Sequence, residues 1–395
     1  MRGTAFHPRT EPMNRTLAWG EWAGYLAAQV YADFHDIEYN AIREQAALID
    51  VSPLCKYRVT GRDALALVDR VITRDATRMT VGQVFYTPWC DDDGNLVDDG
   101  TVARRGDQEF FWTAADATYR WLLLNASGLD VTVEDVTDDV AGLAVQGPRS
   151  RAVLEAAGDV SLADLAPFRT RPITIGGVAA EVSRTGYTGD LGFEVWSPAA
   201  RALDVWDAIW TAGRPHGVRP AGIRALDVAR VEAGLILAEV EYTGARHAIS
   251  DEQRYTPGEV GLGRFVDLAK PSFVGRRALL AERDRGGPRR NLVGLHLDWA
   301  DIEGAYAGHG LPPHVSPMVQ RAPVPLERDG RRVGFATSIT WGPTIKRMVG
   351  FGSVPRDASR LGTRLSVDWT IEGERHRIGA TVVALPFLDL PRRRA

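Results

Sequence analysis

The spacing of apolar residues divides the chain into a mixed helix-and-strand part and a strand-rich part that follows it. In the first part, segments with apolar residues at helical spacing are interspersed with segments in which apolar and polar residues alternate. This pattern predicts helices at 17–32, 37–48, 64–71, 117–124, 203–213 and 221–234. It predicts strands at 56–60, 82–88, 109–116, 131–136 and 193–196, and a hairpin at 173–184. The first part is therefore expected to be an α+β unit.

The two ends of the chain and one internal stretch lack such patterns. Residues 1–16 are polar and are expected to form an extended arm, and the basic residues 391–395 a disordered tail. Residues 283–290 contain two glycines and a proline and indicate a linker. Beyond it, strands are predicted at 291–297, 324–326, 332–339 and 365–369, which favours a small antiparallel barrel or sandwich. We therefore expect two domains, 1–285 and 286–395.

Composition excludes several classes of protein and ligand. The chain has 395 residues, of which 45% are apolar and 25% charged, as in ordinary globular proteins. The net charge of −4 provides no field that would attract nucleic acid. No apolar run is long enough for a membrane span, and no signal-peptide pattern is present. With only two cysteines, Cys55 and Cys90, we expect a cytoplasmic protein without nucleic-acid or membrane partners.

No metal site is predicted from ligand spacing. The acidic run 91–95 lacks the alternating ligands and distant glutamate of a calcium loop, and is instead expected to be a hairpin turn. His309 and His314 have no acidic or cysteine partner at ligand spacing along the chain.

The most distinctive stretch of the sequence is 184–196. It reads Arg-Thr-Gly-Tyr-Thr-Gly-Asp-Leu-Gly-Phe-Glu-Val-Trp. Three glycines in seven positions indicate a turn that needs positive φ or a close approach of another group. In the strand that follows, Phe193 and Val195 face one side, so that Glu194 and Trp196 face the other. From spacing alone, most strand carboxylates of this kind are solvated.

This stretch resembles the signature of the glycine-cleavage T-protein (aminomethyltransferase) family. Further resemblances follow in the family's order along nearly the whole chain: Asp-Val-Ser at 50–52, Asp-Asp at 98–99, Ala-Val-Gln-Gly-Pro at 144–148 and Arg-x-Glu-Ala-Gly at 230–234. The resemblance implies tetrahydrofolate as cofactor. It also implies a fold of two interleaved α+β subdomains and a C-terminal antiparallel β-barrel, with a central folate channel.

The resemblance also implies roles for particular residues. Glu194 would bind the 2-amino group and ring N3–H of the pterin, because a carboxylate matches two parallel donors. Asp98, the first of the paired aspartates, would be the catalytic carboxylate near N5, and Asp99 on the opposite face should tolerate substitution. Further cofactor contacts are expected from Tyr187, Thr113, Arg230 and Tyr86, and substrate contacts from His247 and Trp341.

His247 lies in residues 239–258, which depart from the family's usual length and which we call the insertion. A lone histidine in a polar loop is more often solvated than functional. Its position beside the expected substrate entrance is the reason to include it.

Three residues depart from the aminomethyltransferase pattern: Pro53, Thr113 and Leu226. The segment 112–116 instead resembles dimethylsulfoniopropionate demethylases. The preferred interpretation is therefore a demethylase that transfers the methyl group of a small S-, N- or O-methylated donor to N5 of tetrahydrofolate. One alternative is aminomethyl transfer giving 5,10-methylenetetrahydrofolate. Another is a non-enzymatic folate-binding accessory protein, although the Lys-Gly-Cys-x-x-Gly-Gln-Glu motif of such proteins is absent.

Overall fold

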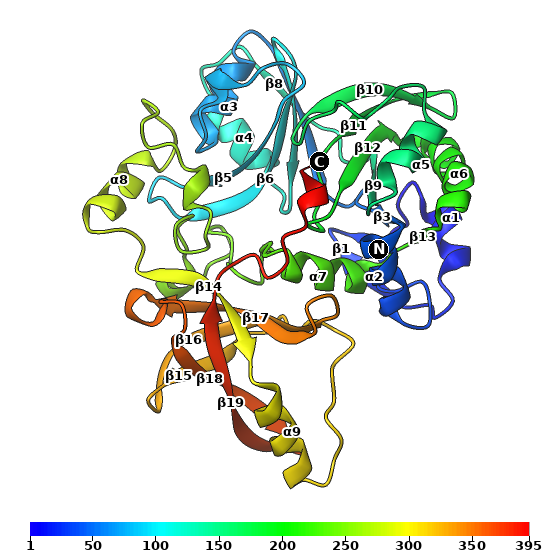
Figure 1. The fold of residues 1–395 in the computed structure, drawn as a ribbon. Helices are drawn as coiled ribbons and strands as arrows, with labels where there is room; N and C mark the ends of the chain where they lie inside the picture. Colours follow the sequence, from blue (N-terminus) through cyan, green and yellow to red (C-terminus); the bar gives the residue numbers. More distant parts are fainter. Residues whose placement is uncertain (395) are drawn as a thin grey trace.

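Two sheets and a closed barrel form the computed structural model, which describes residues 1–394 (Figure 1). The first sheet has the strand order β10-β11-β12-β9-β3-β13, in which only β13 runs parallel to its neighbour. Its strands are β3 Ala46–Asp50, β9 Val140–Gln146, β10 Thr170–Ile175, β11 Val178–Ser183, β12 Gly192–Pro198 and β13 Val218–Pro220. The helices packed against its strands are α2 His35–Glu44, α5 Ser150–Ala157 and α6 Ala202–Gly213.

The second sheet is antiparallel and has the order β5-β6-β7-β4-β8. Its elements are β4 Cys55–Thr60, β5 Val84–Cys90, β6 Leu96–Gly106, β7 Glu109–Ala114, β8 Thr132–Asp135, and the helices α3 Ala64–Val71 and α4 Tyr119–Asn125. All of them lie between β3 and β9 in the chain, so the two α/β units are interleaved. The predicted fold class is confirmed.

The C-terminal strands close into a six-stranded barrel in which every pairing is antiparallel. Its elements are β14 Arg290–Leu297, β15 Val324–Arg328, β16 Arg331–Gly342, β17 Arg347–Pro355, β18 Arg364–Ile371, β19 Glu374–Val383, and the helix α9 Trp299–Gly308. Helix α8 Arg276–Asp284 precedes the barrel. The pattern did not predict β17 or β19, because glycines interrupt their apolar alternation.

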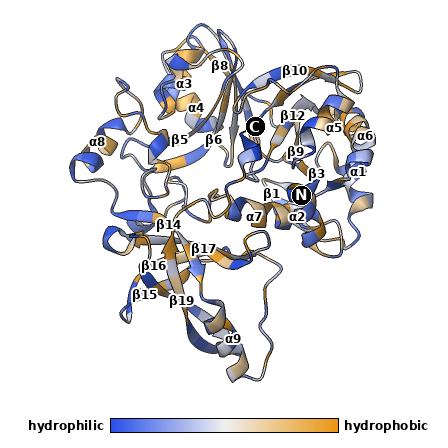
Figure 2. Cartoon of the chain, in the orientation of Figure 1, coloured by the Kyte–Doolittle hydropathy of each residue, from blue (hydrophilic) through white to orange (hydrophobic). Residues whose placement is uncertain are grey.

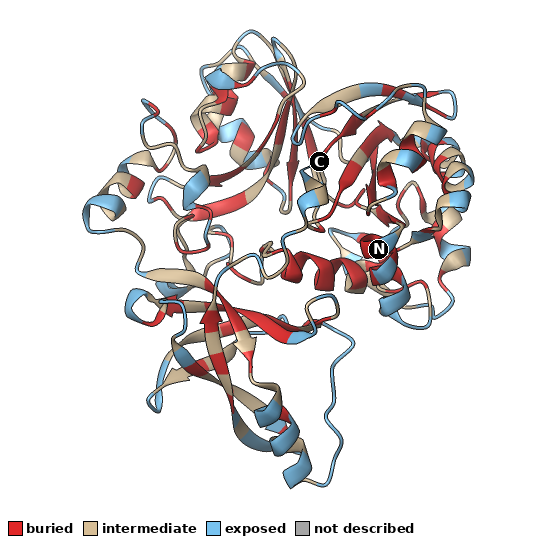
Figure 3. Cartoon of the chain, in the orientation of Figure 1, coloured by how far each residue is buried: buried red, intermediate tan, exposed pale blue. Residues whose placement is uncertain are grey.

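Helix α7 Ile223–Glu232 lies between the barrel and the first sheet (Figure 1). Eight of its ten residues are buried, and Figure 3 shows it as an almost continuous buried segment. One hydrophobic cluster joins it to both sheets and to the barrel strand β17, through residues such as Ile49, Phe111 and Phe351. Figure 2 shows that this buried helix also carries hydrophilic residues, which require internal partners.

Three local predictions are wrong. Residues 17–32 form a hairpin, β1 Trp19–Trp22 and β2 Tyr25–Ala28, instead of a helix. Its two turn residues, Ala23 and Gly24, have positive φ values of 48° and 85°, the requirement of a tight hairpin turn. The arm at 1–16 contains the short helix α1 His7–Thr10, and Pro391–Arg393 form a 3-10 turn docked on the N-terminal part.

None of the helices among residues 1–394 is long and apolar enough to cross a membrane.

Candidate functional site

The glycine-rich motif at 184–196 is organised around the side chain of Gln146 from β9. A Cβ atom on Gly186 or on Gly192 would lie 2.2 Å from Gln146 Oε1, so neither position can carry a side chain without displacing it. Gln146 Nε2 donates to the carbonyl of Phe193, and Thr188 Oγ1 donates to Gln146 Oε1. The glycines therefore allow the two family-like motifs to interlock.

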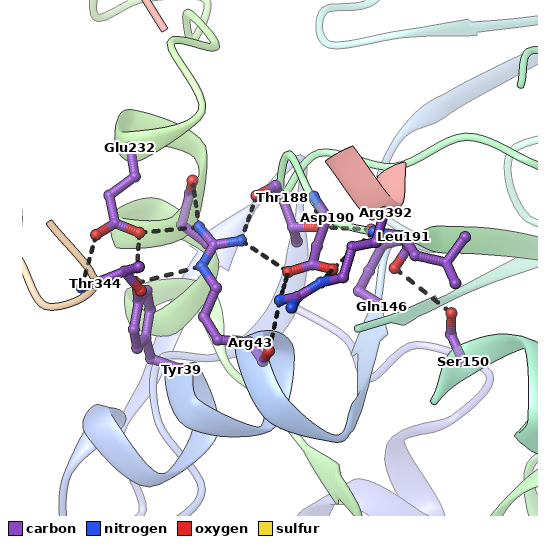
Figure 4. Close-up of polar contacts among 11 residues, drawn as sticks. Tyr39, Arg43, Gln146, Ser150, Thr188, Asp190, Leu191, Glu232, Thr344 and Arg392 are labelled. Carbon is purple, nitrogen blue, oxygen red and sulfur yellow. Dashed lines mark hydrogen bonds and ion pairs between the residues drawn. The ribbon is translucent and has the colours of Figure 1, made fainter. Parts of the chain in front are cut away.

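The next part of the motif is held by charged groups from distant segments (Figure 4). The Asp190 carboxylate is fully buried and accepts two hydrogen bonds of 2.7 Å from Arg392 in the C-terminal turn. Arg43 of α2 donates to the Thr188 carbonyl at 2.8 Å and to Glu232 Oε2 at 3.0 Å. Because all of these charges except that of Arg392 are buried, their mutual pairing fixes the position of the motif.

Glu194 projects from β12 on the face opposite Phe193, as the alternation predicts. Phe193 is fully buried in the core of the first sheet, whereas Glu194 is half-buried. The Thr185 hydroxyl donates to Glu194 Oε2 at 2.5 Å. Burial raises the pKa of the Glu194 carboxyl, and the Thr185 hydrogen bond opposes that shift. A carboxylate has about four lone-pair sites, so capacity for further donors remains.

Asp98 and Asp99 occupy different environments on β6. Asp98 is 1% exposed. The amide of Asp99 donates to its Oδ1 at 2.8 Å, and the amide of Asp116 donates to its Oδ2 at 3.0 Å. Burial raises the pKa of Asp98 well above its usual range, and the adjacent charge of Asp99 acts in the same direction. The Tyr242 hydroxyl also donates to Asp98 Oδ1, at 3.3 Å. Asp98 is thus buried in the protein, where it fixes the loop that follows β7 and shares Tyr242 with Asp99.

Asp99 is instead half-buried and bound by two tyrosine hydroxyls. Tyr86 OH donates to Oδ2 at 2.5 Å, and Tyr242 OH donates to Oδ1. Burial raises the pKa of Asp99, and the two hydroxyls oppose the shift. Tyr86 also contacts Phe265 edge to face, with ring centroids 5.1 Å apart. Tyr86, predicted from the sequence as a cofactor contact, is thus a hydrogen-bond partner of Asp99 in the structure.

Tyr187 connects the two carboxylate positions. It belongs to the same motif as Glu194, and its electrostatic neighbours include Asp99. Its hydroxyl donates to the carbonyl of Ile236, and its ring packs against the central hydrophobic cluster. Burial raises the pKa of the phenol, so Tyr187 remains a neutral aromatic wall at physiological pH.

Arg230 is completely buried and its donors are used within the protein. It donates to Asp227 at 2.8 Å, to Glu241 at 2.9 Å and to Ser338 Oγ at 2.7 Å. Burial lowers the pKa of the guanidinium, but Glu241, Tyr187 and Asp227 outweigh it, so that the net shift is upward. Arg230 therefore joins α7, the insertion and the barrel.

The remaining predicted residues lie in three separate places. The Thr113 hydroxyl is 2.6 Å from that of Thr101 on the neighbouring strand, within the second sheet. Trp341 packs against Trp299 within the barrel, with ring centroids 5.4 Å apart. His247 Nε2 lies 2.7 Å from Asp116 Oδ2, and its side chain is 51% exposed.

His247 is connected to the aspartate pair through a short chain of contacts. Arg246 also binds Asp116, at 2.8 Å, and the Asp116 amide binds Asp98. Burial raises the pKa of Asp116, but hydrogen bonds from His247, Ala117 and Arg246 outweigh it and lower the net pKa. Asp98, Asp99 and Asp116 form a group that we call the aspartate cluster. The insertion therefore lies at the edge of this cluster, and its Arg246 and His247 side chains are partly exposed.

The sequence analysis assigned no site role to Asp99, Tyr242, Asp116 or Glu241. Alternation could show that Asp98 and Asp99 face opposite sides, but not which side faces the site. The pairing of β5 with β6 shifts register between Trp89 and Cys90, and Leu96, Val97 and Asp98 are consequently all buried in succession. Tyr242 and Glu241 carried no signal because they lie in the segment that departs from the family pattern.

Two family comparisons cover most of the chain. Residues 12–270 match the GCVT N-terminal domain. Residues 309–389 match the glycine cleavage T-protein C-terminal barrel domain.

The similar proteins include enzymes with two different named activities. A trimethylamine-oxide aldolase from Ruegeria pomeroyi is 35% identical over 98% of this chain, which spans only 47% of that protein's length. An aminomethyltransferase from Moorella thermoacetica is 36% identical, with 94% of both chains covered. The crystal structure of the glycine cleavage system aminomethyltransferase T from Bartonella henselae superposes with a TM-score of 0.82 at 25% identity, covering 98% of each chain.

Proposed function

Because the chain belongs to the glycine-cleavage T-protein family, we propose that it is a tetrahydrofolate-dependent methyltransferase. It would take the methyl group of a small S-, N- or O-methylated donor and form 5-methyltetrahydrofolate. The observation that carries the proposal is the half-buried Asp99 carboxylate, held by the Tyr86 and Tyr242 hydroxyls on the second sheet.

The residues around Glu194 fit the pterin. Glu194 is a half-buried carboxylate whose pKa is raised by burial, and Thr185 fills one of its acceptor sites. Such a group would gain most from a ligand with two adjacent N–H donors, because charge-assisted hydrogen bonds are strongest away from water. Tyr187 supplies an aromatic face along the path from Glu194 toward Asp99. When bound, tetrahydrofolate supplies the nucleophilic N5 that accepts the carbon.

Asp99, more than Asp98, has the environment of a reacting carboxylate. Asp98 accepts two backbone amides and a longer, 3.3 Å hydrogen bond from the Tyr242 hydroxyl, whereas Asp99 accepts only hydroxyls, from Tyr86 and Tyr242, which can shift as charge changes. Burial raises the pKa of both carboxyl groups toward the range in which a carboxylate can accept a proton at neutral pH, and Asp99 is the more exposed of the two. We assign to Asp99 the stabilisation of positive charge at N5 and acceptance of its proton. Asp98 positions Asp99 and the Asp116 loop.

The donor would enter beside the insertion. Arg246 and His247 lie at the edge of the aspartate cluster, where they can orient a polar donor without contacting the folate position. Displacement at a methyl carbon needs alignment of donor and acceptor more than covalent help from the protein. Leu226 supports methyl over aminomethyl transfer, because it places a buried apolar side chain where the family's aminomethyltransferases have a cation.

A second candidate is aminomethyl transfer, favoured by relatives named aminomethyltransferase at up to 36% identity. The two candidates differ in the oxidation level of the product carbon. The test is mass spectrometry of the folate products after incubation with tetrahydrofolate and a panel of methylated donors, with glycine-cleavage intermediates as a separate arm. The proposal expects 5-methyltetrahydrofolate from at least one donor. Production of 5,10-methylenetetrahydrofolate alone would favour the second candidate.

A further inference from the structure

Three potential metal ligands meet where the end of α9 lies beside β19, far along the chain from the aspartate cluster. His309 Nε2 and His376 Nε2 are 2.9 Å apart, and His309 Nε2 lies 3.9 Å from Glu374 Oε2. One ligand atom from each residue lies within 4.8 Å of the others. The two imidazoles are half-buried, and Glu374 is exposed. No other group of three such residues occurs within 1–394.

The fold explains why the sequence could not reveal this cluster. Glu374 and His376 are two residues apart on β19, so their side chains project from the same face of the strand. His309 follows the last turn of α9, about 65 residues earlier in the chain than Glu374. Helix α9 is fixed to β19 because Asp301 Oδ2 accepts the Gly379 amide at 2.8 Å, and the Asp298 amide donates to the Gly379 carbonyl at 2.7 Å.

The contact between the two imidazoles requires either a hydrogen bond or a cation between the Nε2 atoms. Two neutral imidazoles whose Nε2 atoms face each other need one to donate a proton, and two lone pairs pointing together would repel. A cation between them satisfies both lone pairs. On a tetrahedral zinc ion, two nitrogen ligands lie roughly 3.3 Å apart, so the pair needs to open by only a few tenths of an ångström.

Two further features favour a cation at this point. His309 follows the C-terminal end of α9, which is the negative end of the helix dipole and attracts positive charge. Glu374 contributes a negative charge that balances part of the charge of a divalent ion. Two imidazoles with one carboxylate suit borderline ions such as Zn²⁺, Co²⁺ or Ni²⁺, and not Mg²⁺ or Ca²⁺, which prefer oxygen ligands.

We propose that His309, His376 and Glu374 form a binding site for a zinc-class divalent cation that joins α9 to the β18–β19 hairpin. Water would complete the coordination, because three protein ligands leave a position open. The site is independent of the folate chemistry, so its test does not depend on the proposed activity.

The experiment uses the full-length chain without a histidine tag, treated with chelator and then dialysed. Zn²⁺ binding is measured by isothermal titration calorimetry, and Co²⁺ binding by visible absorption, which is intense only for four- or five-coordinate ions. The proposal expects one tight Zn²⁺ equivalent and an intense Co²⁺ spectrum, with Mg²⁺ inert. His309→Gln and His376→Gln should each weaken Zn²⁺ binding by more than the roughly 10–100-fold that loss of an outer-sphere partner costs.

His314→Gln is the matched control, because His314 is exposed in the segment after α9 and lies outside the cluster. It should bind Zn²⁺ as the wild type does. The proposal is overturned if the wild type shows no saturable Zn²⁺ binding, or if His309→Gln and His376→Gln both bind with wild-type affinity. Circular dichroism of each variant confirms that it is folded, so that loss of binding cannot be assigned to unfolding.

Discussion

Two adjacent residues on one strand can have different roles when a register shift changes which groups surround each side chain. Asp98 and Asp99 illustrate this: Asp98 is bound mainly by two backbone amides and shares Tyr242 with Asp99, which is bound by tyrosine hydroxyls alone. We expect Asp99→Asn to lower kcat by about 10²–10⁴, the usual range for a general base or electrostatic stabiliser. The tetrahydrofolate Kd should change only a few-fold.

Asp98→Asn is the matched control, since it makes the same chemical change one residue away. It leaves a buried amide group facing the Asp99 and Asp116 amides, so the principal effect should be a lower Tm. Steady-state kinetics and calorimetry on both variants separate the roles. Wild-type turnover by Asp99→Asn, together with an inactive but fully stable Asp98→Asn, would return the catalytic role to Asp98.

Glu194 provides a second test at this scale. Glu194→Gln puts an amide donor where an acceptor is required, and loss of a charged hydrogen bond costs about 1.5–3 kcal/mol, or roughly 10- to 150-fold in tetrahydrofolate Kd. Glu181→Gln on the neighbouring strand is the control: Glu181 is half-buried but paired with Arg105, so folate affinity should be unaffected. Equal Kd values for Glu194→Gln and wild type in titration calorimetry would remove Glu194 from the site.

The raised pKa of Glu194 also predicts a pH dependence. Burial favours the protonated form, so the carboxylate is lost at a higher pH than for a solvated glutamate. Wild-type folate affinity should therefore be constant near neutral pH and fall as the pH decreases through this raised pKa. Glu194→Gln should lack that dependence.

Among the elements, the insertion is the one in which two neighbouring pairs of residues have separate tasks. Glu241 binds the buried Arg230, and Tyr242 binds Asp99. Arg246 and His247 both bind Asp116 and face outward. We expect His247→Ala to raise the donor KM and to leave the folate Kd nearly unchanged.

Glu241→Ala should instead destabilise the protein by about 3–5 kcal/mol, because it leaves Arg230 as an incompletely paired buried charge. Glu252→Ala, an exposed carboxylate in the same insertion, should have neither effect. Loss of folate affinity in His247→Ala without any change in donor KM would contradict this division.

The helices and strands that the sequence predicted are those in which apolar residues recur at a regular spacing. Helix α7 and strand β12 were found, and the need of Arg230 and Glu232 for buried partners is confirmed. The richness of residues 17–32 in Trp, Tyr and Ala indicated a helix, but these residues form a hairpin in which Gly24 occupies the turn. Contacts such as Arg392 with Asp190 join residues about 200 positions apart, and no local pattern encodes them.

At the scale of the whole molecule, the C-terminal turn links the barrel to the glycine-rich motif. Arg392 pairs with the fully buried Asp190 and also donates to the Arg43 carbonyl at 2.6 Å. Because Arg392 is itself 39% exposed and Arg43 remains near Asp190, we expect Arg392→Ala to cost about 1–3 kcal/mol in urea unfolding.

The neighbouring Arg394 is the control for this change. It pairs with Asp389, both side chains are largely exposed, and Arg394→Ala should change stability by about 0.5 kcal/mol or less. Equal urea midpoints for Arg392→Ala and Arg394→Ala would mean that the turn does not fix the motif.

The central claim is that an intact methyl group moves from donor to folate, and isotopic labelling tests it most directly. A donor with a ¹³CD₃ methyl group is incubated with tetrahydrofolate and the wild-type protein, and the folate product is analysed by mass spectrometry. We predict 5-methyltetrahydrofolate that retains the ¹³C and all three deuterium atoms, with formation strongly reduced in Asp99→Asn. A 5,10-methylene product that has lost one of the three deuterium atoms would contradict methyl transfer.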